Sequence, residues 1–187
     1  MKRRISVIGA GSMGTAVSIL LAENGHSVMM WTPFEAEANM INTEREQSEK
    51  LPGIKIPDNV ECTVDLEKTL NYSDIIILVI PSQTMRENIS KMSPLIKGKK
   101  VFACFSKGLE KDTGFRMSEV ISQEMQGHEI SIVSMSGPCH AEELAKGIPS
   151  LYVAASRDKE AAELIQDCFM SPRFRVYTNP DIIGVEL

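Results

Sequence analysis

The chain has 187 residues, of which 43% are hydrophobic, and a formal net charge of −5. This length and apolar content suit one domain with a buried core and exclude a disordered chain. The 20 basic residues are scattered among 25 acidic ones, so we expect no nucleic-acid partner, because phosphate backbones require a concentrated basic face.

Cysteine usage and apolar runs limit the chemistry and the compartment. The four cysteines have no C-x-x-C spacing, and only three histidines accompany them, so we expect no metal site and four free thiols in a reducing cytoplasm. The basic start resembles a signal peptide superficially, but Gly9 interrupts the apolar stretch that follows it. The strongly apolar run from Ile75 to Ile80 is too short to cross a bilayer. We therefore expect a cytoplasmic protein with no membrane association.

Short β-rich runs alternate with longer helical ones along the chain. The predicted strands are Ile5–Ile8, Ser27–Trp31, Val60–Thr63, Ile75–Ile80, Val101–Phe105, Ile130–Ser134, Leu151–Ala155 and Arg175–Tyr177. The predicted helices are Thr15–Glu23, Asp65–Leu70, Thr84–Lys91, Phe115–Gln126, Ala141–Lys146 and Lys159–Phe169. This alternation predicts an α/β fold, a doubly wound Rossmann-type domain with a largely parallel sheet over residues 1–187.

Two other segments have their own signals. The stretch Leu51–Asp58 holds two prolines and a glycine, which predicts irregular structure; a functional flap and a plain connection both remain open. Near the end, Asn179 fits a helix cap and Pro180 a first helical position, and an apolar pattern then runs to Leu187. That helix would have roughly two turns, which is marginal alone, so it is either a docked terminal helix or the start of a longer one.

The first turn carries a G-x-G-x-x-G pattern with glycines at Gly9, Gly11 and Gly14, between a predicted strand and a predicted helix. In that context Gly9 permits the tight turn, Gly11 lets the backbone approach a pyrophosphate, and Gly14 allows close helix–strand packing. The start of the following helix offers unpaired N–H groups to the phosphates. We therefore expect the turn to bind a nicotinamide dinucleotide.

The residues after the second strand do not decide between NAD and NADP. An acid commonly ends this strand in NAD-selective domains, but Trp31 is followed by Thr32 and Pro33, and the first acid is Glu35. No arginine is present there to receive a 2′-phosphate. Glu35 is interpreted as a solvated residue at a helix start.

Three further motifs follow predicted strands, where open α/β sheets bind ligands. In Ser106–Glu110, Lys107 could reach an anion or a polarised oxygen, or be a plain surface lysine. In Ser136–Glu143, Gly137 and the helix start could contact cofactor or substrate, or form only a cap and turn. Pro81 lies at the same edge, with Ser82 as a helix cap. Lys107 is the one charged candidate for general acid–base chemistry at this edge.

Together these motifs resemble the bacterial-type NAD(P)-dependent glycerol-3-phosphate dehydrogenases. The matching stretches occur in family order and cover nearly the whole chain: Val7–Ala16, Leu51–Gly53, Val79–Ser82, Ser106–Glu110, Ser136–Pro138, Ala141–Glu143, Phe174–Tyr177 and Gly184–Leu187. The resemblance implies hydride exchange between sn-glycerol 3-phosphate and dihydroxyacetone phosphate, supplying phospholipid synthesis. It implies cofactor contacts from the fingerprint glycines, Ser12, Met13, Pro81, Lys107 and Ala141, and substrate contacts from Lys107, Gly137 and Cys139.

The chain departs from the family pattern at several positions. Met13 stands where the family commonly has tryptophan, Pro33 where it often has a basic residue or histidine, Cys139 where it has a hydroxyl residue, and His140 where it has phenylalanine. In the family the Gly184–Leu187 stretch continues to a catalytic lysine and an all-helical domain. We therefore expect no catalytic residue within this chain, a missing C-terminal helical domain, and some self-association through the exposed apolar end, with a homodimer left open.

Two alternatives remain beside this interpretation. One is another dehydrogenase of the superfamily, such as a ketopantoate-reductase-like or sugar-nucleotide enzyme, although the Ser106–Glu110 and Ser136–Glu143 motifs argue against it. The other is a non-enzymatic dinucleotide-binding module.

Overall fold

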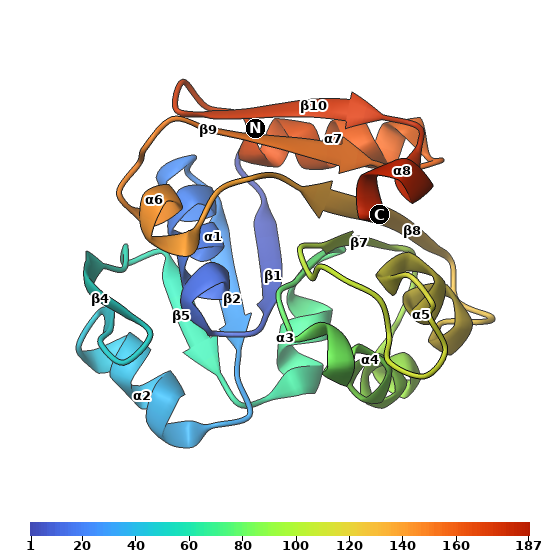
Figure 1. The fold of residues 1–187 in the computed structure, drawn as a ribbon. Coiled ribbons are helices and arrows are strands. Elements are labelled where there is room, and N and C mark those ends of the chain that lie inside the picture. Colours follow the sequence, from blue (N-terminus) through green and yellow to red (C-terminus); the bar gives the residue numbers. More distant parts are fainter.

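Eight strands form one sheet in the order β10-β9-β8-β7-β6-β1-β2-β5 in the computed structural model, which describes residues 1–187 (Figure 1). All neighbouring strands pair in parallel except β8 and β9, which are antiparallel. The strands are β1 (Arg4–Ile8), β2 (Ser27–Trp31), β5 (Val60–Thr63), β6 (Ile75–Leu78), β7 (Lys100–Cys104), β8 (Ile130–Ser136), β9 (Ser150–Ala155) and β10 (Phe174–Asn179). The predicted α/β fold with a largely parallel sheet is confirmed.

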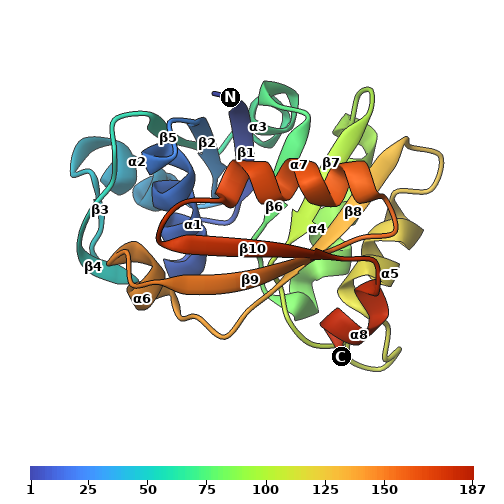
Figure 2. The same cartoon turned by 90° about the horizontal axis from the view of Figure 1, so that it is seen from above.

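Helices cover both faces of the sheet (Figures 1 and 2). They are α1 (Ser12–Glu23), α2 (Glu35–Thr43), α3 (Leu66–Tyr72), α4 (Met85–Met92), α5 (Met117–Glu124), α6 (Ala141–Ala145), α7 (Lys159–Phe169) and α8 (Ile182–Glu186). Two 3-10 turns, Ser82–Thr84 and Ser93–Leu95, flank α4. None of the helices combines the length and apolar content that a bilayer crossing requires.

The central strand β6 shows why both faces must be covered. Ile75 and Ile77 belong to the hydrophobic cluster beneath α1, α6 and α7, whereas Ile76 and Leu78 belong to the cluster beneath α4 and α5. All four side chains are at least 95% buried. A strand buried on both faces has no polar alternation, so the central position of β6 explains the uniformly apolar sequence of this predicted strand.

The predicted irregular structure of Leu51–Asp58 is wrong over its first five residues. Leu51–Lys55 forms strand β4, which pairs antiparallel with β3 (Glu46–Gln47) in a separate two-stranded ribbon. Pro52 is tolerated because a two-stranded ribbon consists of edges, where an unpaired backbone position costs nothing. Gly53 has a φ of +78° and donates its N–H to Glu46 Oε1 at 2.7 Å. Pro52 and Gly53 therefore accompany an irregular pairing of β3 with β4 but do not prevent it.

Two helix predictions also need correction. Helix α2 begins at Glu35, the exposed helix start indicated by the sequence, but its extent was not predicted, because it has no side-chain cap at Phe34 and buries only Glu37, Ala38 and Ile41. The last helix begins at Ile182 and is capped by Asp181, which accepts from Gly184 N at 2.9 Å, and not by Asn179. Asn179 remains in β10 because it still pairs with Ala155 of β9.

His26 connects three parts of the fold in the turn between α1 and β2. Its Nδ1 accepts from the Arg3 backbone N–H, and its Nε2 donates to the Cys168 carbonyl of α7, both at 3.1 Å. One neutral tautomer makes both bonds, whereas protonation would place a second N–H against the Arg3 donor. Burial, with further contributions from the N-terminal amine and Arg3, lowers the pKa of His26 below its usual value of 6.5.

The lowered pKa of His26 predicts a loss of stability on mild acidification. The unfolded chain binds a proton at His26 near pH 6.5 and the folded chain only at lower pH, so the free energy of unfolding falls as pH drops through 6.5, by at most about 1.4 kcal/mol per pH unit. Urea unfolding at about pH 7.5 and about pH 5.5 measures this slope. His26→Gln should flatten the slope, while His140→Gln, at an exposed position, should keep it. An unchanged slope in His26→Gln would refute the assignment.

Candidate functional site

The turn between β1 and α1 forms a cradle in which two glycines are required by packing and one faces open space. A Cβ on Gly9, whose φ is +114°, would lie 2.3 Å from the Val79 carbonyl oxygen. A Cβ on Gly14 would lie 2.0 Å from the Gly9 carbonyl oxygen. A Cβ on Gly11, in contrast, would meet no atom within 4 Å. Gly9 and Gly14 therefore bring helix and strand together, and Gly11 leaves room for a ligand to approach the backbone.

The start of α1 offers positive charge to that space. No side chain caps the helix at Gly11, and no acidic residue lies in its first turn. The first N–H groups of a helix have no partner within it, so those of Ser12, Met13 and Gly14 remain available to a ligand. Together with the helix dipole these donors favour an anion such as a pyrophosphate. The cradle therefore fits the dinucleotide predicted from the sequence.

A cleft of about 940 Å³ runs along the carboxyl edge of the sheet and holds most of the predicted site. Its wall includes eight predicted residues: Gly9, Gly11, Ser12, Met13, Gly14, Pro81, Lys107 and Cys139. It falls in the size range of cofactor sites. The ends of β1, β2, β6 and β7 contribute to it because parallel strands terminate at the same edge.

Two predicted residues do not line the cleft themselves. Ala141 begins α6 and is buried in the core. Gly137 approaches β9 so closely that a Cβ would lie 2.4 Å from the Leu151 carbonyl oxygen. The Gly137 carbonyl nevertheless accepts a hydrogen bond from Lys107 Nζ at 2.6 Å, so the structure brings the two predicted loops into contact.

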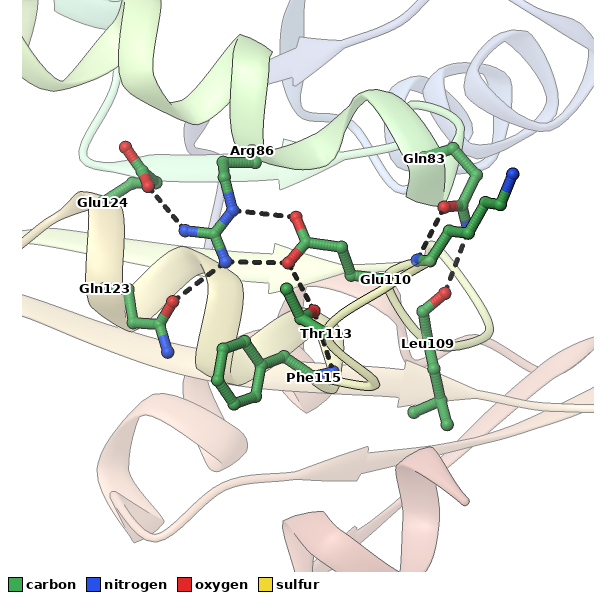
Figure 3. Close-up of polar contacts among 9 residues, drawn as sticks. Gln83, Arg86, Leu109, Glu110, Thr113, Phe115, Gln123 and Glu124 are labelled. Carbon is green, nitrogen blue, oxygen red and sulfur yellow. Dashed lines mark hydrogen bonds and ion pairs between the residues drawn. The ribbon is translucent and has the colours of Figure 1, made fainter.

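A network of polar side chains holds the loop that carries Lys107 (Figure 3). Arg86 of α4 donates to both carboxylate oxygens of Glu110 at 2.8 Å and also reaches Glu124 of α5 at 2.6 Å. Hydrogen bonds from Arg86 and then Thr113 hold the pKa of the Glu110 carboxyl below its usual range. The loop is therefore tied to two helices through a carboxylate that stays ionised.

Gln83 fixes the same loop on its other side (Figure 3). Its side-chain amide donates to the Leu109 carbonyl and accepts from the Lys111 N–H, both at 2.9 Å. Gly108, between these contacts and Lys107, has a φ of +97°, a conformation that glycine adopts without strain. These contacts restrict where the backbone of Lys107 can lie, although none of them was apparent from the motif itself.

The second loop, between β8 and α6, presents Cys139 and His140 to the cleft. Glu143 Oε2 accepts from the His140 N–H at 3.1 Å and so closes the helix start. Cys139 Sγ donates to the Leu151 carbonyl at 3.8 Å, and no bond joins it to His140. The structure contains no group of three or more His, Cys, Asp or Glu side chains placed to bind a metal ion.

Four charged residues of the cleft wall were not predicted as site residues: Glu37, Lys50, Glu87 and Lys91. Glu37 of α2 and Lys50 of the β3–β4 ribbon both line the cleft beyond the end of β2. Glu37 follows Gly14 by 23 residues, close to the spacing of about 20 at which a ribose-binding acid is expected. That spacing could have identified Glu37, but Glu35 is the first acid after β2, and the extent of α2, which carries both residues, was not predicted.

The family model and the relatives that match this chain all point to the same protein family. A model of the NAD-dependent glycerol-3-phosphate dehydrogenase N-terminus matches residues 4–162. A glycerol-3-phosphate dehydrogenase (NAD(P)+) of Agathobacter rectalis is 42% identical over 98% of this chain and 54% of its own length. A protein of the same name from Bacillus cytotoxicus is 44% identical, again over 98% and 54%.

A solved structure agrees with these relatives. The 2.1 Å crystal structure of glycerol-3-phosphate dehydrogenase from Coxiella burnetii superposes with a TM-score of 0.92 at 32% identity, over 99% of this chain and 56% of that one. The chain thus spans about half the length of the curated relatives it matches.

Proposed function

The chain belongs to the NAD-dependent glycerol-3-phosphate dehydrogenase family, to whose N-terminal part it corresponds, and we propose that residues 1–187 form one domain that presents NAD or NADP to a small phosphorylated substrate. The observation that carries this proposal is the open cradle at Gly11, which shares one cleft with Lys107. A pyrophosphate in the cradle would direct the rest of a dinucleotide along the carboxyl edge of the sheet.

The proposed roles follow the two ends of the cleft. The turn from Gly9 to Gly14 binds the pyrophosphate through backbone N–H groups, and Met13 and Pro81 pack beside the cofactor; Ala141, buried beneath the second loop, supports it indirectly. At the other end Lys107, Cys139 and the Gly137 carbonyl lie around the space for the substrate. The ammonium group of Lys107 suits a phosphate or a carbonyl oxygen that gains negative charge.

The proposed reaction is that of the named relatives, which are glycerol-3-phosphate dehydrogenases. When bound, the dinucleotide exchanges the hydride that interconverts glycerol 3-phosphate and dihydroxyacetone phosphate. Within this chain Lys107 orients the substrate oxygen and stabilises its charge. We propose that proton transfer to that oxygen falls to a group of the C-terminal part of the enzyme, so that this chain alone binds cofactor and turns over little substrate.

We also propose a cytoplasmic setting for this glycerophospholipid-precursor chemistry. The four free cysteines favour a reducing compartment. The mixed distribution of basic and acidic residues argues against a nucleic-acid partner, which requires a concentrated basic face. Exposed apolar side chains at Ile183 and Leu187 favour self-association, with a homodimer as its simplest form.

The test compares this chain alone with a chimaera in which the C-terminal remainder of the Agathobacter rectalis relative follows Leu187. We expect both proteins to bind NADH or NADPH, and only the chimaera to oxidise it rapidly with dihydroxyacetone phosphate. A folded, NADH-binding chimaera that reduces ketopantoate and leaves dihydroxyacetone phosphate unchanged would overturn the proposed substrate. Equal turnover by the chain alone would overturn the division of roles.

A further inference from the structure

A buried carboxylate lies at the end of the cleft where the ribose of a dinucleotide is expected. Glu37 is 6% exposed and its side chain is held from three sides. Oε2 accepts from the Thr32 hydroxyl, and Oε1 accepts from Gln47 Nε2 at 2.7 Å and from Lys50 Nζ at 2.5 Å. Thr32 is the residue directly after β2, so the carboxylate occupies the region where an acid reads ribose hydroxyls in this fold.

Gln47 connects this carboxylate to the phosphate-binding turn. Its amide nitrogen donates both to Glu37 Oε1 and to the Ala10 carbonyl, the latter at 3.0 Å. Because both partners are acceptors, the amide cannot be flipped. Gln47 Oε1 is then the buried side-chain polar atom left without a partner, which a buried water would satisfy.

Lys50 combines a fixed position with free donors. Its side chain is 43% exposed, and its ammonium group lies 6.0 Å from the centroid of the Phe34 ring in the same cleft wall. Only one of its three protons is used, by Glu37. The cleft wall also holds Lys91, which likewise donates to one carboxylate, that of Glu87, at 2.6 Å.

From this arrangement we infer that the Glu37–Lys50 pair reads the 2′ position of the adenosine ribose and sets the preference between NAD and NADP. This inference rests on the proposed function. A carboxylate has about four acceptor positions, of which three are taken, so one on Oε2 remains for the 2′-hydroxyl of NAD. The two unused protons of Lys50 serve a 2′-phosphate of NADP, which competes with Glu37 for the ammonium group.

The charge balance of the pair predicts in which direction each substitution changes the cofactor preference. With both members present, the end of the cleft has no net charge from the pair and accepts either cofactor. Loss of Lys50 would leave the Glu37 carboxylate uncompensated, and it would repel a 2′-phosphate. Loss of the Glu37 charge would leave Lys50 uncompensated, and it would attract one.

The test measures dissociation constants for NADH and NADPH through quenching of Trp31, the single tryptophan, which lines the cleft. Lys50→Met should raise the ratio of the NADPH to the NADH constant about tenfold, the effect of one charge-assisted hydrogen bond. Glu37→Gln should lower the ratio by a similar factor. Lys55→Met, the same change at an exposed position of the same ribbon, should leave the ratio unchanged.

The outcomes separate this inference from the function on which it rests. If the unmodified chain binds neither cofactor, the proposed function fails. If it binds both and Lys50→Met, shown to fold by thermal unfolding, keeps the ratio within about twofold, the inference fails. A ratio that responds to Lys91→Met and not to Lys50→Met overturns it as well, because the phosphate would then be read by α4.

Discussion

Gly14→Ala should unfold the turn between β1 and α1, which is proposed to bind the dinucleotide. Alanine usually stabilises a helix over glycine by up to about 1 kcal/mol, but here its Cβ would lie 2.0 Å from the Gly9 carbonyl oxygen. That oxygen belongs to the backbone, so no side-chain rotation relieves the contact. We expect a net loss of about 2 kcal/mol or more in the free energy of unfolding, measured by urea unfolding, together with loss of measurable NADH binding.

Gly11→Ala provides the matched control because it makes the same chemical change in the same turn. Gly11 has φ −69° and ψ −176°, which alanine adopts without strain, and its Cβ would meet no protein atom. The free energy of unfolding should change by less than about 0.5 kcal/mol. Affinity for NADH should still fall about tenfold or more, because the methyl group occupies the approach of the pyrophosphate. Wild-type affinity in Gly11→Ala would show that the ligand binds elsewhere.

Lys107→Met should have the second large effect, on catalysis by the chimaera described above. Lys107 is the cation at the end of the cleft proposed for the substrate, and its loop is held by Arg86 and Gln83. We expect kcat/KM for dihydroxyacetone phosphate to fall about a hundredfold, as for other groups that stabilise charge in a transition state. Thermal unfolding should be unchanged, since the side chain makes one hydrogen bond, to Gly137.

Lys111→Met is the control for this experiment. Lys111 belongs to the same loop, but it contacts Gln83 through its backbone N–H, so methionine keeps that bond. Its kcat/KM should match that of the unsubstituted chimaera. If Lys107→Met retains kcat/KM within about threefold, Lys107 has no role in binding or stabilising the substrate.

Elements whose signals come from neighbouring residues could be predicted from the sequence, whereas elements that depend on contacts between distant residues could not. The strand β6 and the turn at Gly9–Gly14 were identified because their signals are local: a continuous apolar run and a motif between a strand and a helix. The β3–β4 ribbon was missed because its pairing depends on Glu46 and Gln47, outside the proline-containing stretch that gave the turn signal. Helix α2 was missed because its weak apolar face is stabilised by packing against β5 and not by its own sequence.

The same contrast holds for the candidate site: single residues could be predicted from the sequence, but the contacts between them could not. Lys107 and Gly137 were identified as separate motifs, and their expected position at one sheet edge agrees with their hydrogen bond. The contacts that hold them were beyond a sequence argument, since Arg86 and Glu110 are 24 residues apart and their pairing depends on how α4 packs. Glu37 and Lys50 likewise become a pair only through the ribbon that the sequence did not predict.

Titration of this chain with NADH, followed through Trp31 fluorescence, tests the central claim most directly. Trp31 lies at the end of β2 and lines the same cleft as the turn from Gly9 to Gly14. We predict saturable quenching at one site, with energy transfer to the dihydronicotinamide, that weakens about tenfold in Gly11→Ala. A folded chain whose Trp31 emission does not respond to NADH or NADPH, even at about millimolar concentration, would contradict the assignment of this cleft as a dinucleotide site.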